Sequence, residues 1–183
     1  MRPSVLIGLC ILWIFSLNGF SREFEGLTIS DSEILGEETL PLHGIGVRKA
    51  TLLGIKIYMI AFYYPIKLVS ADELLAKPKN FVIRLKFLRD VSREKIVDAF
   101  RSGFQKNSVD LKNFSSSWKL LDQILRNFTK QDELTFIFHN NKLLIKTSSH
   151  EVSIDQIEFI PQLLKLWFGT PPNEDLKKGL LAL

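Results

Sequence analysis

Two apolar segments within LHGIGVRKATLLGIKIYMIAFYYP, residues 42–65, constrain the fold of this chain most strongly. They predict two strands joined by a short turn, over residues 40–48 and 55–64. Gly44 and Gly46 allow a backbone or a ligand to come close, and Arg48 is in even register with both, so all three face the same side of a regular strand. Arg48 is therefore either a surface charge at a strand end or the anion-binding end of a pocket.

Other segments alternate apolar and polar residues with the period of two that is typical of half-exposed antiparallel strands. In residues 81–87 the odd positions are apolar, while Arg84 and Lys86 face away from them. A meander is predicted near the C-terminus, over residues 133–139, 142–147 and 151–154. Asn140 and Asn141 form its first turn, because asparagine tolerates positive φ.

Helical patterns fall between and after the predicted strands. Ser92 is a good N-cap, and apolar residues follow it at spacings of three and four, at Ile96, Ala99, Phe100 and Phe104. Further helices are predicted over residues 111–128, from about residue 158 to Gly169, and over residues 174–181. Together these elements predict one α+β domain, an antiparallel sheet of about six strands with helices layered on one face.

The first residues have the pattern of a secretory signal peptide. Arg2 precedes an uncharged apolar run over residues 5–17, and small residues follow near Ser21. We expect residues 1–21 to be a signal peptide cleaved near Ser21, with an exported domain over residues 22–183 in the periplasm or secreted. A retained membrane anchor is the alternative, but the run is shorter than the ~18 apolar residues of a spanning helix, so no stable membrane span is expected after cleavage.

Composition and spacing exclude several kinds of chemistry. Cys10, the only cysteine, would leave with the leader, so no thiolate or disulfide is expected. The three histidines lack the spacing of a metal site, and no cofactor or metal is expected. No G-x-S-x-G motif is present either. Loss of Arg2 lowers the basic count from 24 to 23 against 20 acidic residues, and a net charge of +3 is too mild to indicate nucleic-acid binding.

Three separated motifs carry a resemblance to a known family. They are GVR at residues 46–48, FLRDVS at residues 87–92 and WFGTPPNEDLKKGL at residues 167–180. In this order they resemble the chalcone isomerase-like family, in particular its bacterial exported branch, over residues 24–183. The resemblance implies an open sandwich with a cleft between the sheet and its helices. It also implies that Arg48 lines the cleft, holding a substrate oxygen in the true isomerases and a fatty-acid carboxylate in the lipid-binding relatives.

The other catalytic positions of the isomerases are changed in this sequence. Tyr58 stands where the resemblance places a threonine, and its hydroxyl can still hydrogen-bond a ligand head group. Ser92 takes the position of the active-site tyrosine, and Ala99 that of an asparagine. Without those groups the pocket keeps the capture of an oxyanion but loses the hydroxyl network for ring closure. Tyr64 is one of several aromatic residues that could line the remaining pocket.

These observations favour a non-catalytic binding protein that holds a fatty acid or a similar small amphipathic acid. The candidate ligand-binding residues are Arg48, Tyr58, Tyr64 and Ser92, and no catalytic residue is assigned. One alternative is an isomerase or intramolecular lyase acting on an unknown enone or enolisable substrate. A second alternative is an envelope structural or partner protein whose cleft is closed by side chains, with unknown protein partners.

Overall fold

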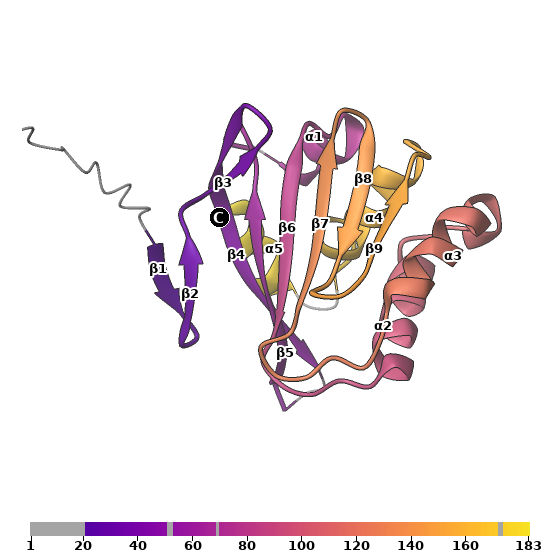
Figure 1. Cartoon of the computed structure of the whole chain (residues 1–183), viewed down its shortest axis with the longest axis horizontal. Coiled ribbons are helices and arrows are strands. Elements are labelled where there is room, and N and C mark those ends of the chain that lie inside the picture. Colours follow the sequence, from indigo (N-terminus) through magenta and orange to yellow (C-terminus); the bar gives the residue numbers. More distant parts are fainter. Residues whose placement is uncertain (1–20, 51–52, 69, 172–173) are drawn as a thin grey trace, which may run out of the picture.

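Seven antiparallel strands form the central sheet of this protein. A computed structural model describes residues 21–50, 53–68, 70–171 and 174–183, so the expected leader lies outside the described residues apart from Ser21. The strands follow one another in chain order across the sheet (Figure 1). They are β3 (Ser32–Leu35), β4 (Glu38–Ala50), β5 (Ile55–Tyr63), β6 (Phe81–Phe87), β7 (Glu133–His139), β8 (Lys142–Lys146) and β9 (Glu151–Ile154).

The predicted sheet is confirmed except for its strand count. Strand β6 has the bounds that its alternation predicts, and Asn140 and Asn141 make the β7–β8 turn with φ of 51° and 60°. The seventh strand is β3, which was not predicted. Its four residues carry too little apolar alternation to be recognised alone, and they become a strand by pairing with β4, from Ser32 opposite Pro41 to Leu35 opposite Glu38.

A separate hairpin of β1 (Ser21–Phe24) and β2 (Leu27–Ser30) lies on the face of the sheet that the helices leave open. Ile29 is buried there with Met59, Ala61 and Tyr63 of β5, and the Tyr63 hydroxyl donates a hydrogen bond of 3.1 Å to the carbonyl of Ser30. This hairpin, also not predicted, gives the sheet a second small core.

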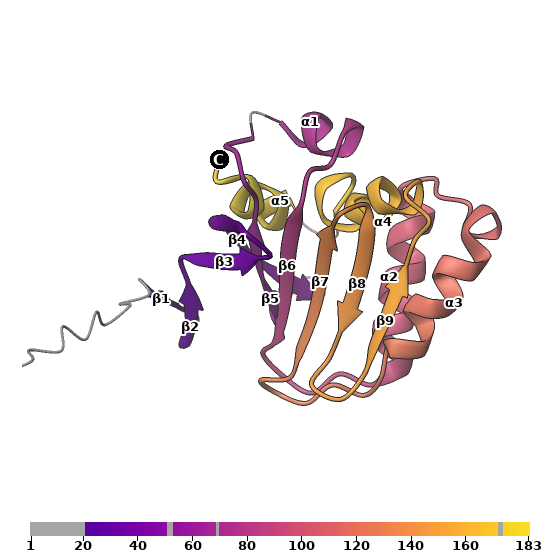
Figure 2. The ribbon, with the colours of Figure 1, turned by 45° about the horizontal axis from the view of Figure 1, so that its top comes forward.

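The helices lie on the other side of the sheet, as predicted; α4 and α5 are behind it in Figure 1, and Figure 2 shows α2 with them. They are α1 (Ala71–Ala76), α2 (Arg93–Lys106), the 3-10 helix η1 (Leu111–Phe114), α3 (Ser115–Ile124), α4 (Phe159–Phe168) and α5 (Glu174–Leu181). Helix α1 was not predicted. No helix among the described residues combines the length and apolar character needed to cross a membrane.

The second helical region is shorter than the predicted residues 111–128. It divides into η1 and α3 and ends at Ile124, because Leu125 is extended with φ −71° and ψ 125°. Phe128 then pairs with Val91 in an isolated β-bridge, in which the Val91 N–H donates to the Phe128 carbonyl at 2.8 Å. The apolar spacing up to Phe128 therefore marks burial rather than helix.

Most of the space between sheet and helices is filled by aromatic side chains. Phe100 of α2 and Trp167 of α4 contact edge to face, with ring centroids 6.2 Å apart, and Phe136 of β7 lies 5.4 Å from the same indole. Each of the three is at most 2% exposed. A cavity adjoins this dense packing near the end of the sheet where β4 and β5 turn.

Candidate ligand-binding site

Arg48 and Tyr58 face each other across β4 and β5 on the helix-covered side of the sheet. They are directly paired, and Gly46 is paired with Ile60 in the same ladder. Tyr58 and Ile60 belong to the main core under the helices, so the face carrying Arg48 is that side. The common face predicted for Gly44, Gly46 and Arg48 is therefore present.

The two glycines admit a helix backbone rather than a ligand. A Cβ at Gly44 would lie 2.3 Å from the Leu180 carbonyl oxygen, and one at Gly46 would lie 2.6 Å from Leu176 Cδ1. Both contacts are with α5, which packs directly on β4. Arg48 is the next residue of this face beyond that contact, so α5 leaves it open to the neighbouring cavity.

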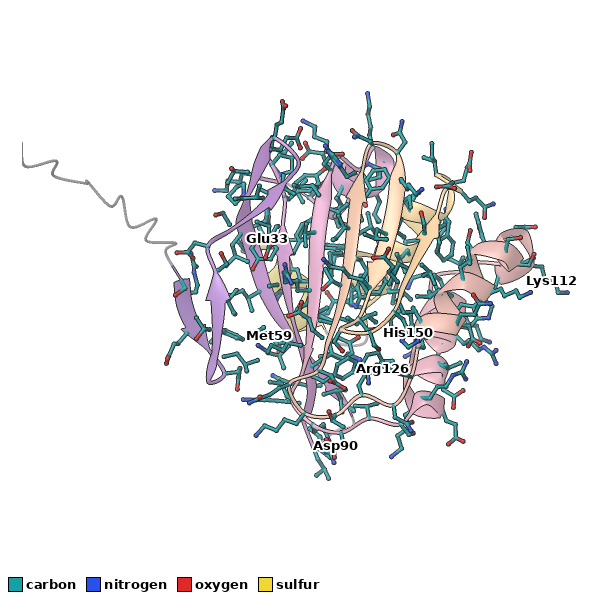
Figure 3. The ribbon with its side chains drawn as sticks, in the orientation of Figure 1. Glu33, Met59, Asp90, Lys112, Arg126 and His150 are labelled. Carbon is teal, nitrogen blue, oxygen red and sulfur yellow. The ribbon has the colours of Figure 1, made fainter. Side chains whose placement is uncertain are left out.

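The cavity beside Arg48 has a volume of about 610 Å³, within the ~300–1,000 Å³ of typical small-molecule sites. One wall comes from β4 and β5 and the other from the end of β6 and the start of α2. Both meet at the lower end of the sheet in Figure 1, where Figure 3 labels Asp90. The described lining residues are Arg48, Ala50, Ile55, Ile57, Tyr58, Arg89, Asp90, Val91, Lys95, Ile96, Asp98 and Ala99.

A much smaller space of about 20 Å³ continues from the inner end of this cavity. Arg48, Tyr58 and Ala99 line both spaces. The smaller one is closed by residues of α2 and α4, namely Phe100, Gly103, Leu166 and Trp167. Arg48 and Tyr58 therefore stand where the cavity meets the filled core.

The charge of Arg48 is not balanced by an ion pair within the described part of the chain. Its Nη1 donates to the neighbouring Lys49 carbonyl, and no carboxylate of the described residues forms an ion pair with it. Arg84, on the opposite face, is the contrast. Its guanidinium donates to Glu33 at 2.7 Å and also to Glu133. Burial lowers the pKa of Arg84, but these two carboxylates raise it by more, so the net shift is upward. Arg48 is thus available to an anion from outside.

Tyr58 adds a neutral hydrogen-bond donor beside this cation. Burial raises the pKa of its hydroxyl above the usual range, against smaller lowering effects of hydrogen bonding with Trp167 and of the charge and hydrogen bonding of Arg48. The phenol therefore keeps its proton at neutral pH. A guanidinium and a phenol at one point form a suitable receptor for a carboxylate.

A family model of chalcone isomerase-like proteins matches residues 21–182. The chain belongs to the chalcone isomerase-like family. Among solved structures, a fatty-acid binding protein from Arabidopsis thaliana superposes with a TM-score of 0.64 at 16% identity, covering 88% of this chain and 96% of the other. At that identity the likeness concerns the fold. A search of curated proteins finds no significant match.

Two of the four candidate ligand-binding residues, Tyr64 and Ser92, do not line the cavity beside Arg48. Tyr64 is 2% exposed, stacks on Phe62 with centroids 5.4 Å apart, and accepts a hydrogen bond of 3.1 Å from the Lys79 N–H. Six residues along an extended chain separate it from Tyr58, a distance of ~20 Å. Ser92 caps α2, where its hydroxyl accepts from the Lys95 N–H at 3.5 Å. Neither residue is among the described lining of the cavity.

Several lining residues were not identified from the sequence. Lys95, Ile96, Asp98 and Ala99 lie on one side of the first turns of α2, and i, i+3 and i, i+4 spacing is the signal that groups them. Ala99 was predicted on the apolar face of this helix and noted for the asparagine it replaces, and it lines both spaces. The residues of the loop after β6, such as Arg89, join them only through the fold.

The lining gives little support to acid–base or metal chemistry. The Asp90 Oδ1 accepts a hydrogen bond of 2.8 Å from the Lys130 N–H, which fixes this carboxylate in the loop after β6. In the part of the chain that the structure describes, no three His, Cys, Asp or Glu side chains gather as metal ligands would. What the arrangement can do is bind an anion beside an apolar surface.

Proposed function

We propose that this protein is an exported, non-catalytic carrier of a fatty acid or a similar small amphipathic acid. The ligand lies in the cavity between the β4–β5 hairpin and α2, with its carboxylate on Arg48 and Tyr58. The single observation that carries this proposal is a guanidinium without an ion pair among the described residues, at the inner end of a cavity with apolar walls.

The energetics are sufficient for useful affinity. A hydrogen bond to a charged group contributes ~1.5–3 kcal/mol net. Each buried methylene contributes ~0.8 kcal/mol, so eight methylenes give about 6 kcal/mol against the cost of association. The apolar contacts come from Ala50, Ile55 and Ile57 on one wall and from Val91 and Ile96 on the other.

The changed positions support binding without turnover. Ala99 contributes no polar group at the junction of the two spaces, and the Ser92 hydroxyl is used as a helix cap. The fatty-acid binding protein with the same fold shows that this architecture can hold such a ligand. Export is supported by the signal-peptide pattern of residues 1–21, and N-terminal sequencing of the protein recovered from a periplasmic fraction tests it.

The test of binding is native and denaturing mass spectrometry of residues 21–183, comparing wild type with Arg48→Ala. We expect a co-purifying carboxylic acid in the wild type and its loss in the variant. Arg101→Ala is the matched control, because it removes the same charge from the surface of α2, where Arg101 lies over Trp118 at 5.3 Å. The control should keep the ligand.

Two results would contradict the carrier proposal. Empty wild-type protein after incubation with a fatty-acid mixture would exclude it. Turnover of a chalcone or a simple enone that collapses in Arg48→Ala, with the fold intact by circular dichroism, would instead favour the isomerase.

A further inference from the structure

The inner end of the cavity is closed to an acyl chain. The space of about 20 Å³ behind Arg48 and Tyr58 holds about one water molecule. Leu166 and Trp167 of α4 wall it and are 5% and 1% exposed. A Cβ built on Gly103 would already lie 2.7 Å from Leu166 Cδ2, so α2 and α4 are in close contact there. A tail cannot pass between these helices.

The opposite end of the cavity is charged and solvated. Arg89, Asp90, Lys95 and Asp98 line it and are all exposed. Within the described residues, neither Arg89 nor Lys95 takes part in an ion pair. The cavity thus runs from one cation at its inner end, past apolar side chains, to a charged rim where Arg89 and Lys95 stand beside Asp90, which accepts from the Lys130 N–H, and Asp98.

We infer that the ligand is an amphipathic acid with a second, anionic group at its far end, such as an α,ω-dicarboxylic acid. This inference rests on the proposed function and specifies its ligand. The first carboxylate binds Arg48 and Tyr58, the chain covers Ile55 and Ile57, and the second group meets Arg89 and Lys95 in water. A pocket that enclosed the tail would instead reject a second carboxylate, because an unpaired charge is costly to bury.

Isothermal titration of residues 21–183 with dodecanoic acid and with dodecanedioic acid tests this inference. We expect the diacid to bind with a Kd no more than threefold above that of the monoacid. In the double variant Arg89→Ala with Lys95→Ala, the ratio of diacid Kd to monoacid Kd should rise five- to tenfold. The Lys95 change keeps the backbone N–H that Ser92 caps.

The matched control is Lys112→Ala with Lys119→Ala, which removes the same charge from exposed positions on η1 and α3. It should leave the ratio unchanged. A diacid that binds more than thirtyfold more weakly than the monoacid, or a ratio that does not move in the rim variant, would overturn this inference and leave the carrier proposal standing. Failure of both acids to bind would overturn the proposed function and this inference with it.

Discussion

Gly44→Ala is expected to destabilise the fold without acting on the ligand. The new Cβ would lie 2.3 Å from the Leu180 carbonyl oxygen and 2.4 Å from that of Gly179, which are backbone atoms of α5 and cannot rotate away. Helix α5 must therefore shift off β4. If Gly44 served ligand approach instead, the same change would reduce binding and leave stability intact.

The size of the effect follows from what α5 buries. Leu176 and Leu180 are completely buried and Leu181 is 4% exposed, so complete undocking would cost ~5–9 kcal/mol at ~1.5–3 kcal/mol per side chain. A partial shift is cheaper, and overpacking usually costs ~1–3 kcal/mol. We expect about 3 kcal/mol, a large part of a typical total stability of ~5–15 kcal/mol.

Urea denaturation followed by circular dichroism measures this loss as a lower midpoint at constant slope. Gly26→Ala is the matched control. A Cβ there meets no atom within 4 Å, and only the φ of 71° is unfavourable, so ~1 kcal/mol is expected. A Gly44→Ala protein that loses less than 1 kcal/mol would refute the close packing of α5 on β4.

Three further changes test other parts of the molecule. Ala99→Trp should fill the cavity from an exposed position on α2 and abolish the binding of dodecanoic acid measured by titration, while the free energy of unfolding in urea changes by less than ~1 kcal/mol. Retained binding would place the ligand elsewhere. His43→Ala should lower the free energy of unfolding by ~1–3 kcal/mol, because His43 hydrogen-bonds the Leu180 carbonyl at 3.0 Å and the Leu68 N–H at 2.9 Å. An unchanged midpoint of urea denaturation would contradict both bonds. Burial raises the pKa of Tyr63 from 10 to about 12, so its contribution to the free energy of unfolding is full below pH 10 and falls by ~2–3 kcal/mol as the pH rises to 12. Tyr63→Phe should lack this part of the loss in urea titrations over that pH range, and a pH profile identical to that of the wild type would contradict the prediction.

The central sheet could be predicted because its signals are local. Alternation in residues 81–87 and the asparagine turn at residues 140–141 each act over a few neighbouring positions, and β6 and the β7–β8 turn appear as expected. Strand β3 pairs with the neighbouring β4 but has too little apolar alternation to be recognised, and the β1–β2 hairpin buries its apolar face against distant residues of β5. Tyr63, for example, lies 33 residues from the Ser30 carbonyl that it bonds. No local pattern encodes such a contact.

The site shows the same division between local and distant signals. The register of the first strand left Arg48 open between a surface charge and a pocket, and the family resemblance placed both Arg48 and Tyr58 at the cleft; the hairpin pairs them directly. Tyr64 and Ser92 were proposed as an aromatic residue and a hydroxyl near the motifs. Tyr64 instead packs in the core, and Ser92 caps α2. The rim is assembled from β6 and α2 and could be recognised only after these elements were placed together.

Which arginine of this sheet can bind a ligand is decided by residues far away in the sequence. The alternation of Arg84 with apolar neighbours predicts an exposed side chain. Its guanidinium instead lies between Glu33, 51 residues earlier, and Glu133, 49 residues later, on the helix-free face. Arg48 looks equally ordinary, but no carboxylate of the described residues forms an ion pair with it, although Asp90 and Asp98 line the same cavity. Arg48 is half-buried, and a ligand carboxylate would give its guanidinium a charge-assisted hydrogen bond. The lack of an ion pair at Arg48, in the part of the chain that is described, is therefore the feature on which the proposed binding site rests.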